Sequence, residues 1–396
     1  MQGDSIPVSY GNDSKALHAL EEGAVVMDVS NNPRLRVSGP DASAFLHGQT
    51  SADVKSMKIG SSMEASILTP QGRMIDLVLL VRMESGVLLI CSPGMGETVK
   101  SHFEKHIFMN DQVEVMDISS DTKMFRVMGP NSNDILFTLK ASEEIVAGKI
   151  GSCGVMGFDG KPLVVIKGTD LGYSGYTLII DEQGAPLLWK NLNAFQVEPM
   201  GTQAWEIARV LSGRPVLGHE LSEKFNPFDA GLCHTISLNK GCYVGQEALS
   251  KIHNLNAGKY EIWGISIQKP CLVGDKVFAK YSGDGSGKKE VGMITSYVDT
   301  PSMQHRALAY LNRKVLGSPG GLPKLWNGAR VMVGQQEIPG QVVNVPYPQR
   351  SLPKENMPRE KNEGEFLSSG SKLDKARERE EKLKLMQARL DEWKSA

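Results

Sequence analysis

Lys240-Gly241-Cys242-Tyr243-Val244-Gly245-Gln246-Glu247 is the densest run of chemically demanding residues in the chain. In this octapeptide a thiol lies between a cation and an aromatic ring, two glycines bracket it, and an amide and a carboxylate follow. Glycine costs stability wherever its backbone freedom is not needed. Two glycines around one cysteine therefore predict a tight turn that presents the sulfur.

Cys242 has two interpretations, and the residues alone favour neither. A thiol reacts or ligates as the thiolate, and Lys240, two positions earlier, would favour that anion. A helix beginning near Val244 would do the same, because the N-terminus of a helix carries partial positive charge. Gln246 and Glu247 would then lie in its first turn. The alternative is a buried structural cysteine, which is how most free cysteines behave.

The composition is that of a globular protein of several domains. The chain has 396 residues, of which 40% are hydrophobic and 22% charged. Since domains run to about 100–200 residues, two or three are expected. The net charge of −1 gives no global signal for nucleic acid or an acidic membrane. No apolar run approaches the ~20 residues of a membrane span, so no membrane partner is predicted.

The five cysteines form no C-x-x-C pair, and their number is odd. A disulfide framework is therefore not expected, and a reducing compartment is the better prediction. Cys233, His234 and Cys242 are close in sequence, but their spacing matches no zinc pattern, so no metal site is predicted. Residues 1–10 show neither a signal-peptide core nor an Arg-rich stretch. This fits a cytosolic protein or a sequence without its transit peptide.

An internal repeat divides the first two thirds of the chain. Arg36-Val37-Ser38-Gly39-Pro40-Asp41 recurs ninety positions later as Arg126-Val127-Met128-Gly129-Pro130-Asn131. In both copies a strand would run through Gly-Pro into a helix whose first turn carries Asp or Asn. The repeat predicts two related α+β modules, each with an antiparallel sheet. The alternative is chance similarity, because strand–Gly-Pro–helix turns are common.

The amino-acid composition of the remaining residues changes twice. From Leu255 short β-rich runs are separated by Gly, Pro and Asp, which predicts a small antiparallel β-barrel. The expected fold class is therefore α+β, with an N-terminal extension (1–22), a first module (23–120), a second module with the octapeptide (121–254) and a barrel (255–347). Residues 348–370 are expected to be a flexible linker.

Residues 371–396 form the last predicted segment. They alternate charges with an apolar stripe at the spacing of one helix face: Leu383, Met386, Leu390 and Trp393. Either a solvated helix or a docking helix for a partner fits this pattern, and so short a helix is marginal alone.

A long loop follows the helix predicted for Thr202 to Leu211. It begins at Ser212-Gly213-Arg214-Pro215 and carries Gly and Pro at turn positions as far as Pro227. Long loops that are not of low complexity are usually functional, so this loop is a candidate part of a site.

The octapeptide resembles the signature of the YgfZ-type folate-binding proteins, relatives of the glycine-cleavage T-protein, an aminomethyltransferase. Weaker matches lie in order along residues 20–347: Phe45 to Val54 resembles an F-L-x-G-Q-x-T-x-D-V pattern, Ile67 to Arg73 a hairpin, Gly172 to Tyr176 a strand entry and Gly292 to Ser296 a barrel motif. Ser51 departs from the first pattern. The overall sequence pattern is most similar to that of the plant plastid branch of this family.

This resemblance implies a T-protein-like, three-lobed ring of domains around a central folate site. It implies tetrahydrofolate as the ligand, and a role in iron–sulfur cluster assembly or repair with client or assembly proteins as partners. It also implies a chloroplast location, with the mitochondrion as the alternative.

The resemblance assigns candidate roles to particular residues. Cys242 would be the functional thiol with Lys240 beside it, and Asp76 the surviving member of an aspartate pair that includes the catalytic one in the T-protein. Leu211 stands where the T-protein has a Glu that holds the pterin ring. The candidate folate-binding residues are Tyr243, Gln246, Glu247, Lys251 and Arg73; for Lys251 and neighbouring His253, ordinary exposed helix positions are an equal alternative.

Three hypotheses for function follow. The leading one is a folate-dependent factor for iron–sulfur cluster assembly or repair that acts through Cys242. The runner-up is a tetrahydrofolate-dependent one-carbon transferase that uses Asp76, so enzymatic activity is left open. The third is a scaffold that recruits partners through residues 371–396.

Overall fold

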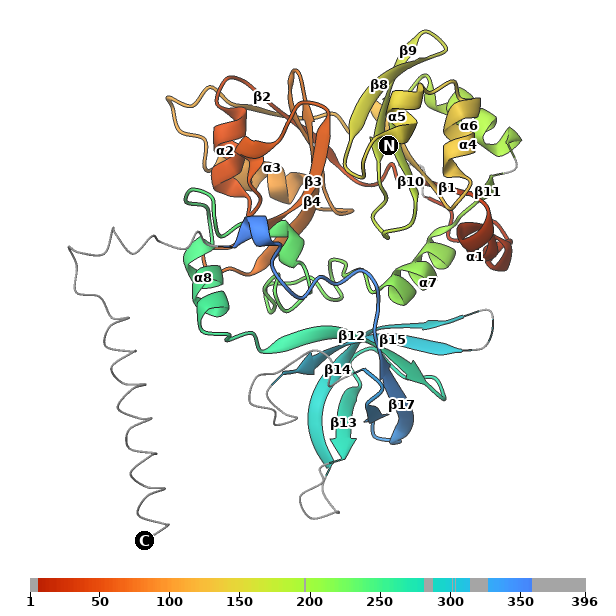
Figure 1. Ribbon diagram of the computed structural model, residues 1–396, viewed down its shortest axis with the longest axis vertical. Helices are drawn as coiled ribbons and strands as arrows, with labels where there is room; N and C mark the ends of the chain where they lie inside the picture. The colour runs from red at the N-terminus through yellow and green to blue at the C-terminus, as the bar shows by residue number, and fades with distance from the viewer. Residues whose placement is uncertain are drawn as a thin grey trace, which may run out of the picture. The chain divides into compact units, whose positions relative to one another are not determined.

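The computed structural model describes residues 6–195, 197–280, 288–300, 302, 304–313 and 327–357. These residues form two sheets with helices on their outer faces and a closed barrel of six strands (Figure 1). The expected fold class, two α+β modules followed by an antiparallel barrel, is confirmed.

The first sheet has the strand order β3-β4-β5-β2-β6. α2 (Ala42–Gln49) and α3 (Gly96–Glu104) cover one face, where Leu46 and Phe103 are fully buried in its core. Side chains alternate between faces along each strand, so Leu88 and Ile90 point to the opposite face. The strands are β2 (Arg34–Ser38), β3 (Ser61–Leu68), β4 (Met74–Met83), β5 (Gly86–Ile90) and β6 (Glu114–Asp117).

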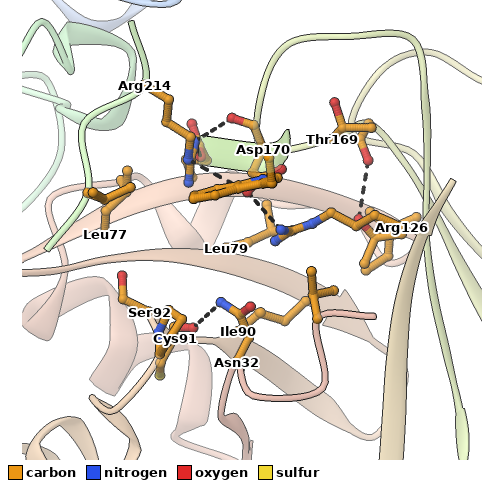
Figure 2. Close-up of a pocket in the computed structure, with 18 of the residues that line it drawn as sticks. Asn32, Leu77, Leu79, Ile90, Cys91, Ser92, Arg126, Thr169, Asp170 and Arg214 are labelled. Atoms are coloured by element: carbon orange, nitrogen blue, oxygen red, sulfur yellow. Dashed lines mark hydrogen bonds and ion pairs between the residues drawn. The ribbon is translucent and has the colours of Figure 1, made fainter. Parts of the chain in front are cut away.

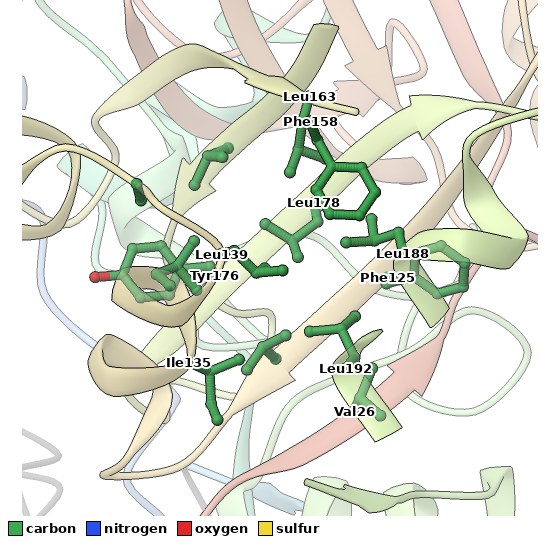
Figure 3. Packing of buried hydrophobic residues seen from close by; sticks show 14 of the residues in the cluster. Val26, Phe125, Ile135, Leu139, Phe158, Leu163, Tyr176, Leu178, Leu188 and Leu192 are labelled. Atoms are coloured by element: carbon green, nitrogen blue, oxygen red, sulfur yellow. The ribbon is translucent and has the colours of Figure 1, made fainter. Parts of the chain in front are cut away.

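The second sheet has the order β11-β1-β7-β10-β9-β8. Its outer face packs against α4 (Ser132–Thr138), α5 (Glu143–Ala147) and α6 (Ala185–Ala194), in a core that includes Phe125 and Leu188 (Figure 3). The strands are β1 (Val25–Asp28), β7 (Thr122–Met128), β8 (Cys153–Phe158), β9 (Lys161–Lys167), β10 (Gly175–Asp181) and β11 (Glu198–Pro199).

The inner faces of the two sheets share a third core. It joins Leu88 and Ile90 of the first sheet to Met27 and Met124 of the second. α1 (Asp13–Glu22) and α7 (Thr202–Ser212) contribute buried alanines and Leu20 to the same cluster. The two modules are therefore packed face to face.

The sequence repeat corresponds to one repeated turn. After β2, Gly39 has φ +108°, and a Cβ there would lie 2.1 Å from the carbonyl oxygen of Gln112. After β7, Gly129 has φ +117°, and a Cβ would lie 2.5 Å from the carbonyl oxygen of Gly23. Both turns therefore require glycine, for the backbone angle and for the close approach.

The module boundary expected at residue 120 falls between β6 of the first sheet and β7 of the second, but β1 crosses it. β1 precedes the first repeat but pairs with β7 of the second sheet, and β6 precedes the second repeat but pairs with β2 of the first. Each repeat is thus preceded by a strand of the other sheet, although only β1 departs from the expected module ranges. Local pattern shows that a strand exists but not which edge it joins.

The C-terminal barrel closes in the order β12-β15-β14-β13-β16-β17, and Ile265, Ile294 and Leu311 lie in its core. Among the described residues, all strand pairings of the barrel are antiparallel. Its strands are β12 (Tyr260–Ile267), β13 (Lys276–Lys280), β14 (Lys288–Asp299), β15 (His305–Asn312), β16 (Arg330–Val333) and β17 (Ile338–Val343).

Residues 344–357, called the strap below, return from the barrel to the two modules. Tyr347 N donates to Ser212 O at 2.9 Å, and Gln349 N donates to Gly231 O at 2.6 Å. Leu352 is buried in a core shared with both modules. The linker expected from residue 348 therefore does not begin there, because this stretch is bonded and buried. Residues 358–370 and the predicted helix 371–396 lie outside the described residues.

Short helical segments complete the chain: η1 (Val54–Ser56), η2 (Cys233–Thr235), α8 (Gln246–Asn254) and η4 (Lys354–Asn356). Within the described ranges, no helix has both the length and the apolar character that crossing a membrane requires.

Candidate functional site

A pocket of about 850 Å³ lies between the inner faces of the two sheets. Strands β1, β4, β5, β7 and β9 and the loop after α7 all contribute to its wall. Met27, Leu79 and Ile90 make part of the wall apolar, and Figure 2 labels Leu79 and Ile90. Apolar walls with a few polar groups, at this volume, are typical of sites for small organic ligands.

Glu64 of β3 is the most constrained polar group in the wall. Its Oε1 lies 2.8 Å from Arg214 Nη1, and its Oε2 lies 2.8 Å from His234 Nε2. The strap adds Tyr347, whose hydroxyl donates to Glu64 Oε2 at 2.7 Å. Burial alone would raise the pKa of Glu64, but Arg214, His234 and Tyr347 together hold it well below its ordinary value. Glu64 is therefore a charged anchor.

Arg126 of β7 and Asp170 of the β9–β10 turn form a second buried pair. Arg126 Nη1 donates to Asp170 Oδ2 at 2.7 Å, and Arg214 Nη1 donates to the backbone oxygen of Asp170 at 2.8 Å. Burial lowers the pKa of Arg126, and the nearby Asp170 carboxylate opposes that effect. This pair places a cation and an anion side by side in the pocket wall (Figure 2).

α7 contributes Trp205 and Glu206 to the wall. The Glu206 carboxylate is taken by the fully buried Arg209, whose Nε donates to its Oε2 at 2.7 Å and whose Nη2 donates to its Oε1. Leu211, where the resemblance placed the pterin-holding Glu of relatives, is 38% exposed and does not line the pocket.

Four buried polar atoms of lining residues have no hydrogen-bond partner within the described part of the chain. They are Arg126 Nε, Asp170 Oδ1, Trp205 Nε1 and His234 Nδ1. Most buried polar groups in folded proteins are satisfied, so a cluster of unsatisfied ones needs an explanation. A polar ligand in the pocket would supply it.

Asp76 of β4 lies behind this wall. It is fully buried and does not line the pocket, although its neighbours Leu77 and Ser92 do. Leu77 N donates to its Oδ1 at 2.8 Å, and Ser92 N donates to its Oδ2 at 3.1 Å. Burial raises the pKa of Asp76 to about 6, against the opposing effect of these hydrogen bonds. It can therefore change protonation near neutral pH.

Lys240 lies outside the pocket and does not support the neighbouring thiol. Its ammonium donates to the backbone oxygens of His47, Thr50 and Ala52, the last two at 2.6 and 2.7 Å. An ammonium has three donors, so none is left for the sulfur. Burial lowers the pKa of Lys240 to about 7, whereas three acceptors and the Tyr243 ring, 4.5 Å away, favour the charged form.

Cys242 is exposed, so the alternative of a buried structural cysteine does not apply. It lies just before α8, which begins at Gln246, two residues after Val244, with Gln246 and Glu247 in its first turn as expected. The octapeptide also meets the β3–β4 turn: a Cβ on Gly245, which has φ +85°, would lie 2.8 Å from Thr69 O. The thiol is thus presented on a turn that is fastened to the hairpin whose strands line the pocket.

The five residues expected to bind folate lie away from the pocket wall. Tyr243 is buried in the core beneath the octapeptide, and Gln246 opens α8. Glu247 and Lys251 pair with each other at 2.6 Å with side chains 84% and 68% exposed. Arg73 donates to the backbone oxygen of Lys224 at 3.0 Å. The structure brings none of them to the pocket.

Comparison with known proteins decides the family. The family model of the GCVT N-terminal domain matches residues 5–240. The chain belongs to the GCVT family. It is 35% identical, over 88% of this chain and 77% of the relative, to an Arabidopsis thaliana protein named as a candidate chloroplastic transferase. It is 25% identical to an aminomethyltransferase of Rubrobacter xylanophilus, over 88% of this chain and 89% of the relative.

Among solved structures, the glycine cleavage system aminomethyltransferase T of Bartonella henselae is similar, with a TM-score of 0.73 and 20% sequence identity. The match covers 88% of this chain and 92% of that one. The T-protein-like fold expected from the sequence is therefore confirmed.

The polar wall of this GCVT-family pocket was mostly missed by sequence reasoning. Arg214 lies in the loop that was predicted to be functional, and Arg126 opens the second copy of the repeat. Nothing local marks Glu64 or Asp170, because their partners come from distant segments. The only local sign of Glu64 and Asp170 is a charged residue within an otherwise apolar strand or a turn.

Proposed function

We propose that this GCVT-family protein binds tetrahydrofolate in the pocket and, through Cys242, serves iron–sulfur cluster assembly or repair, as its resemblance to YgfZ-type proteins implies. Folate binding is supported by the set of unpartnered buried polar atoms in the pocket wall. A functional role for the Cys242 thiol is supported by its exposure within an intact octapeptide.

The pocket residues fit a folate. A pterin ring is flat, has donors and acceptors along its edge, and needs both apolar contact and polar partners. Leu79 and Ile90 offer the contact, while Arg126, Asp170 and Trp205 offer unused donors and an acceptor. These residues would hold the ring, because a buried polar group left without a partner costs about 1–3 kcal/mol. When bound, tetrahydrofolate would supply a carrier for one-carbon units.

The exposed thiol suits a partner protein. Thiolates hold iron–sulfur clusters, and of the five cysteines Cys242 alone has an exposed environment. The octapeptide contacts the β3–β4 turn, so ligand binding and thiol presentation share one hairpin. Client or assembly proteins would meet the surface around Cys242.

Complementation tests this role. In cells that lack the protein, Cys242→Ala is expected not to restore the activity of an iron–sulfur enzyme, while the wild type does. Cys153→Ala is the matched control, because Cys153 is the next most accessible thiol and lies in β8. Full rescue by the Cys242 variant would exclude the thiol from the function.

A second candidate function is a tetrahydrofolate-dependent one-carbon transfer, as the names of the relatives suggest. The observation in its favour is Asp76, which lies directly behind the lining residues Leu77 and Ser92 and whose pKa, raised by burial to about 6, suits a group that gives or takes a proton. Asp76→Asn would then abolish turnover of a one-carbon unit on tetrahydrofolate and leave binding intact. Turnover equal to that of the wild type would rule out Asp76 as the base.

The compartment and the tail remain to be tested separately. We propose a plastid location, because the Arabidopsis relative is named as chloroplastic; a fluorescent fusion of the full-length gene product distinguishes it from the mitochondrial alternative.

A partner at residues 371–396 stays a prediction. Deleting those residues would abolish function if the protein is a scaffold and leave it intact otherwise.

A further inference from the structure

Four carboxylates lie in or directly behind the pocket wall, and in three of them both oxygens already accept hydrogen bonds. Both oxygens of Glu64 accept hydrogen bonds from the three neighbours described above. Both oxygens of Glu206 accept from Arg209. Both oxygens of Asp76 accept from backbone amides. Every oxygen of these three carboxylates already has at least one donor, so none of the three leaves a buried oxygen without a partner.

Asp170 is the exception. Its Oδ2 pairs with Arg126, but its Oδ1 is buried and has no partner among the described residues. The side chain is 9% exposed, and Asp170 lines the pocket from the β9–β10 turn. A buried carboxylate oxygen without a donor is costly, and a ligand N–H would remove that cost.

Arg126 has the complementary feature. Its Nη1 is used by Asp170, while its Nε–H is buried and has no acceptor in the described part of the chain. The bonded pair therefore offers one free acceptor and one free donor from adjacent side chains. Figure 2 shows Asp170 between Arg126 and Arg214, both of which hold it.

The turn that carries Asp170 is fixed from two sides. Arg214 donates to its backbone oxygen at 2.8 Å, and Thr169 Oγ1 donates to Tyr173 O at 2.8 Å across the turn. Because Arg214 is itself held by Glu64, the free oxygen of Asp170 is presented on a preorganised support. Preorganised polar groups discriminate strongly between ligands that do and do not match them.

We infer that Asp170 and Arg126 together recognise the cyclic amide edge of the pterin ring, with Asp170 Oδ1 accepting its N–H and Arg126 Nε donating to its C=O. This inference rests on the proposed binding of tetrahydrofolate and deepens it.

The experiment compares two ligands that differ at this edge. Folic acid carries the 4-oxo group and the ring N–H; aminopterin carries a 4-amino group and lacks both. Each is titrated as a competitor of tetrahydrofolate against the full-length wild type, Asp170→Asn and Asp159→Asn. Asp159 is exposed in the β8–β9 turn of the same sheet and serves as the control.

The wild type and the control are expected to prefer folic acid by about tenfold or more. Asp170→Asn keeps the shape of the side chain and an oxygen for Arg126, and its preference is expected to fall towards unity with a melting temperature near that of the wild type. An equal affinity of the wild type for both ligands would overturn the inference, even if the variant failed to fold. So would a wild-type preference that persists in a folded Asp170→Asn. If the wild type binds no tetrahydrofolate, the proposed function fails and the inference with it.

Discussion

At the scale of single residues, Lys240 shows that a charged side chain in a motif can bind backbone carbonyls instead of taking part in a reaction. Its three ammonium donors are used by carbonyls at and just beyond the C-terminal end of α2. A cation at a helix C-terminus is favoured by the helix dipole and satisfies carbonyls that lack intrahelical donors. Lys240 therefore fastens the octapeptide to the first module.

Replacing this lysine is expected to destabilise the fold. Lys240→Met would remove a donor from three carbonyls, of which Ala52 O keeps Val54 N, and lower the free energy of unfolding by roughly 2–3 kcal/mol. Lys251→Met is the control, because the exposed Lys251–Glu247 pair contributes at most about 1 kcal/mol. Urea denaturation of both variants measures the difference. Equal effects would mean that the carbonyls find water or other donors without cost.

Asp76 predicts a pH dependence with a definite sign. Its pKa in the folded protein is about 6, above its ordinary value of 3.8, so between about pH 4 and 6 the folded state keeps a proton that the unfolded state releases. Stability therefore falls as pH rises through this window, by roughly 3 kcal/mol for a shift of this size. Asp76→Asn lacks this loss.

The measurement is the free energy of unfolding of wild type and Asp76→Asn at pH 4.5 and pH 7. The variant is expected to gain on the wild type as pH rises. Glu64 acts in the opposite direction. Because its pKa is lowered in the folded protein, it stabilises the fold at pH values above its ordinary pKa, and this stabilisation is lost on acidification. Both proteins carry Glu64, so its effect cancels in the difference. A difference that does not change with pH would show that Asp76 is ionised normally.

At the scale of elements, the repeated strand–turn–helix predicts where glycine cannot be replaced. Gly39→Ala and Gly129→Ala would each push a Cβ onto a backbone oxygen and force a left-handed angle, so each is expected to cost more than about 3 kcal/mol. Gly94 has a similar angle, φ +80°, but open space around it. Gly94→Ala should therefore cost only about 1–2 kcal/mol.

Thermal unfolding of these three variants separates the two causes. If the Gly94 variant is as unstable as the others, the backbone angle alone explains the requirement and the close approach does not matter. The comparison also tests the repeat, since Gly39 and Gly129 should respond alike.

Most helices and strands could be predicted from periodicity and turn residues, but their partners could not. The helix predicted for Thr202 to Leu211 is α7, which spans Thr202–Ser212. β1, by contrast, was expected in the first module and lies in the second sheet. A short strand such as Val25–Asp28 can pair with any sheet that offers an open edge. Here the edge is β7 of the second sheet, residues 122–128.

At the scale of the whole molecule, the pocket exists only because distant segments meet. Glu64 is held by residues 150, 170 and 283 positions away in the chain. The octapeptide could be singled out from sequence because its residues are contiguous. The pocket wall could not, since each of its polar residues looks ordinary beside its own neighbours.

The separation of pocket and thiol leads to the last prediction. Cys242 is exposed and does not line the pocket, so Cys242→Ala should bind tetrahydrofolate as the wild type does. A ligand at 100 times its dissociation constant stabilises the folded state by about 2.7 kcal/mol. Wild type and Cys242→Ala are therefore expected to show the same rise in melting temperature, by several degrees.

The same titration on Asp170→Asn should give a smaller rise, because that variant weakens the pocket itself. An equal rise for wild type and Cys242→Ala, together with loss of rescue in cells, would assign ligand binding and thiol chemistry to two parts of one molecule. Loss of the rise in Cys242→Ala would instead show that the thiol controls the pocket. The contact between Gly245 and the β3–β4 turn would then be the route, because that hairpin is the element common to both.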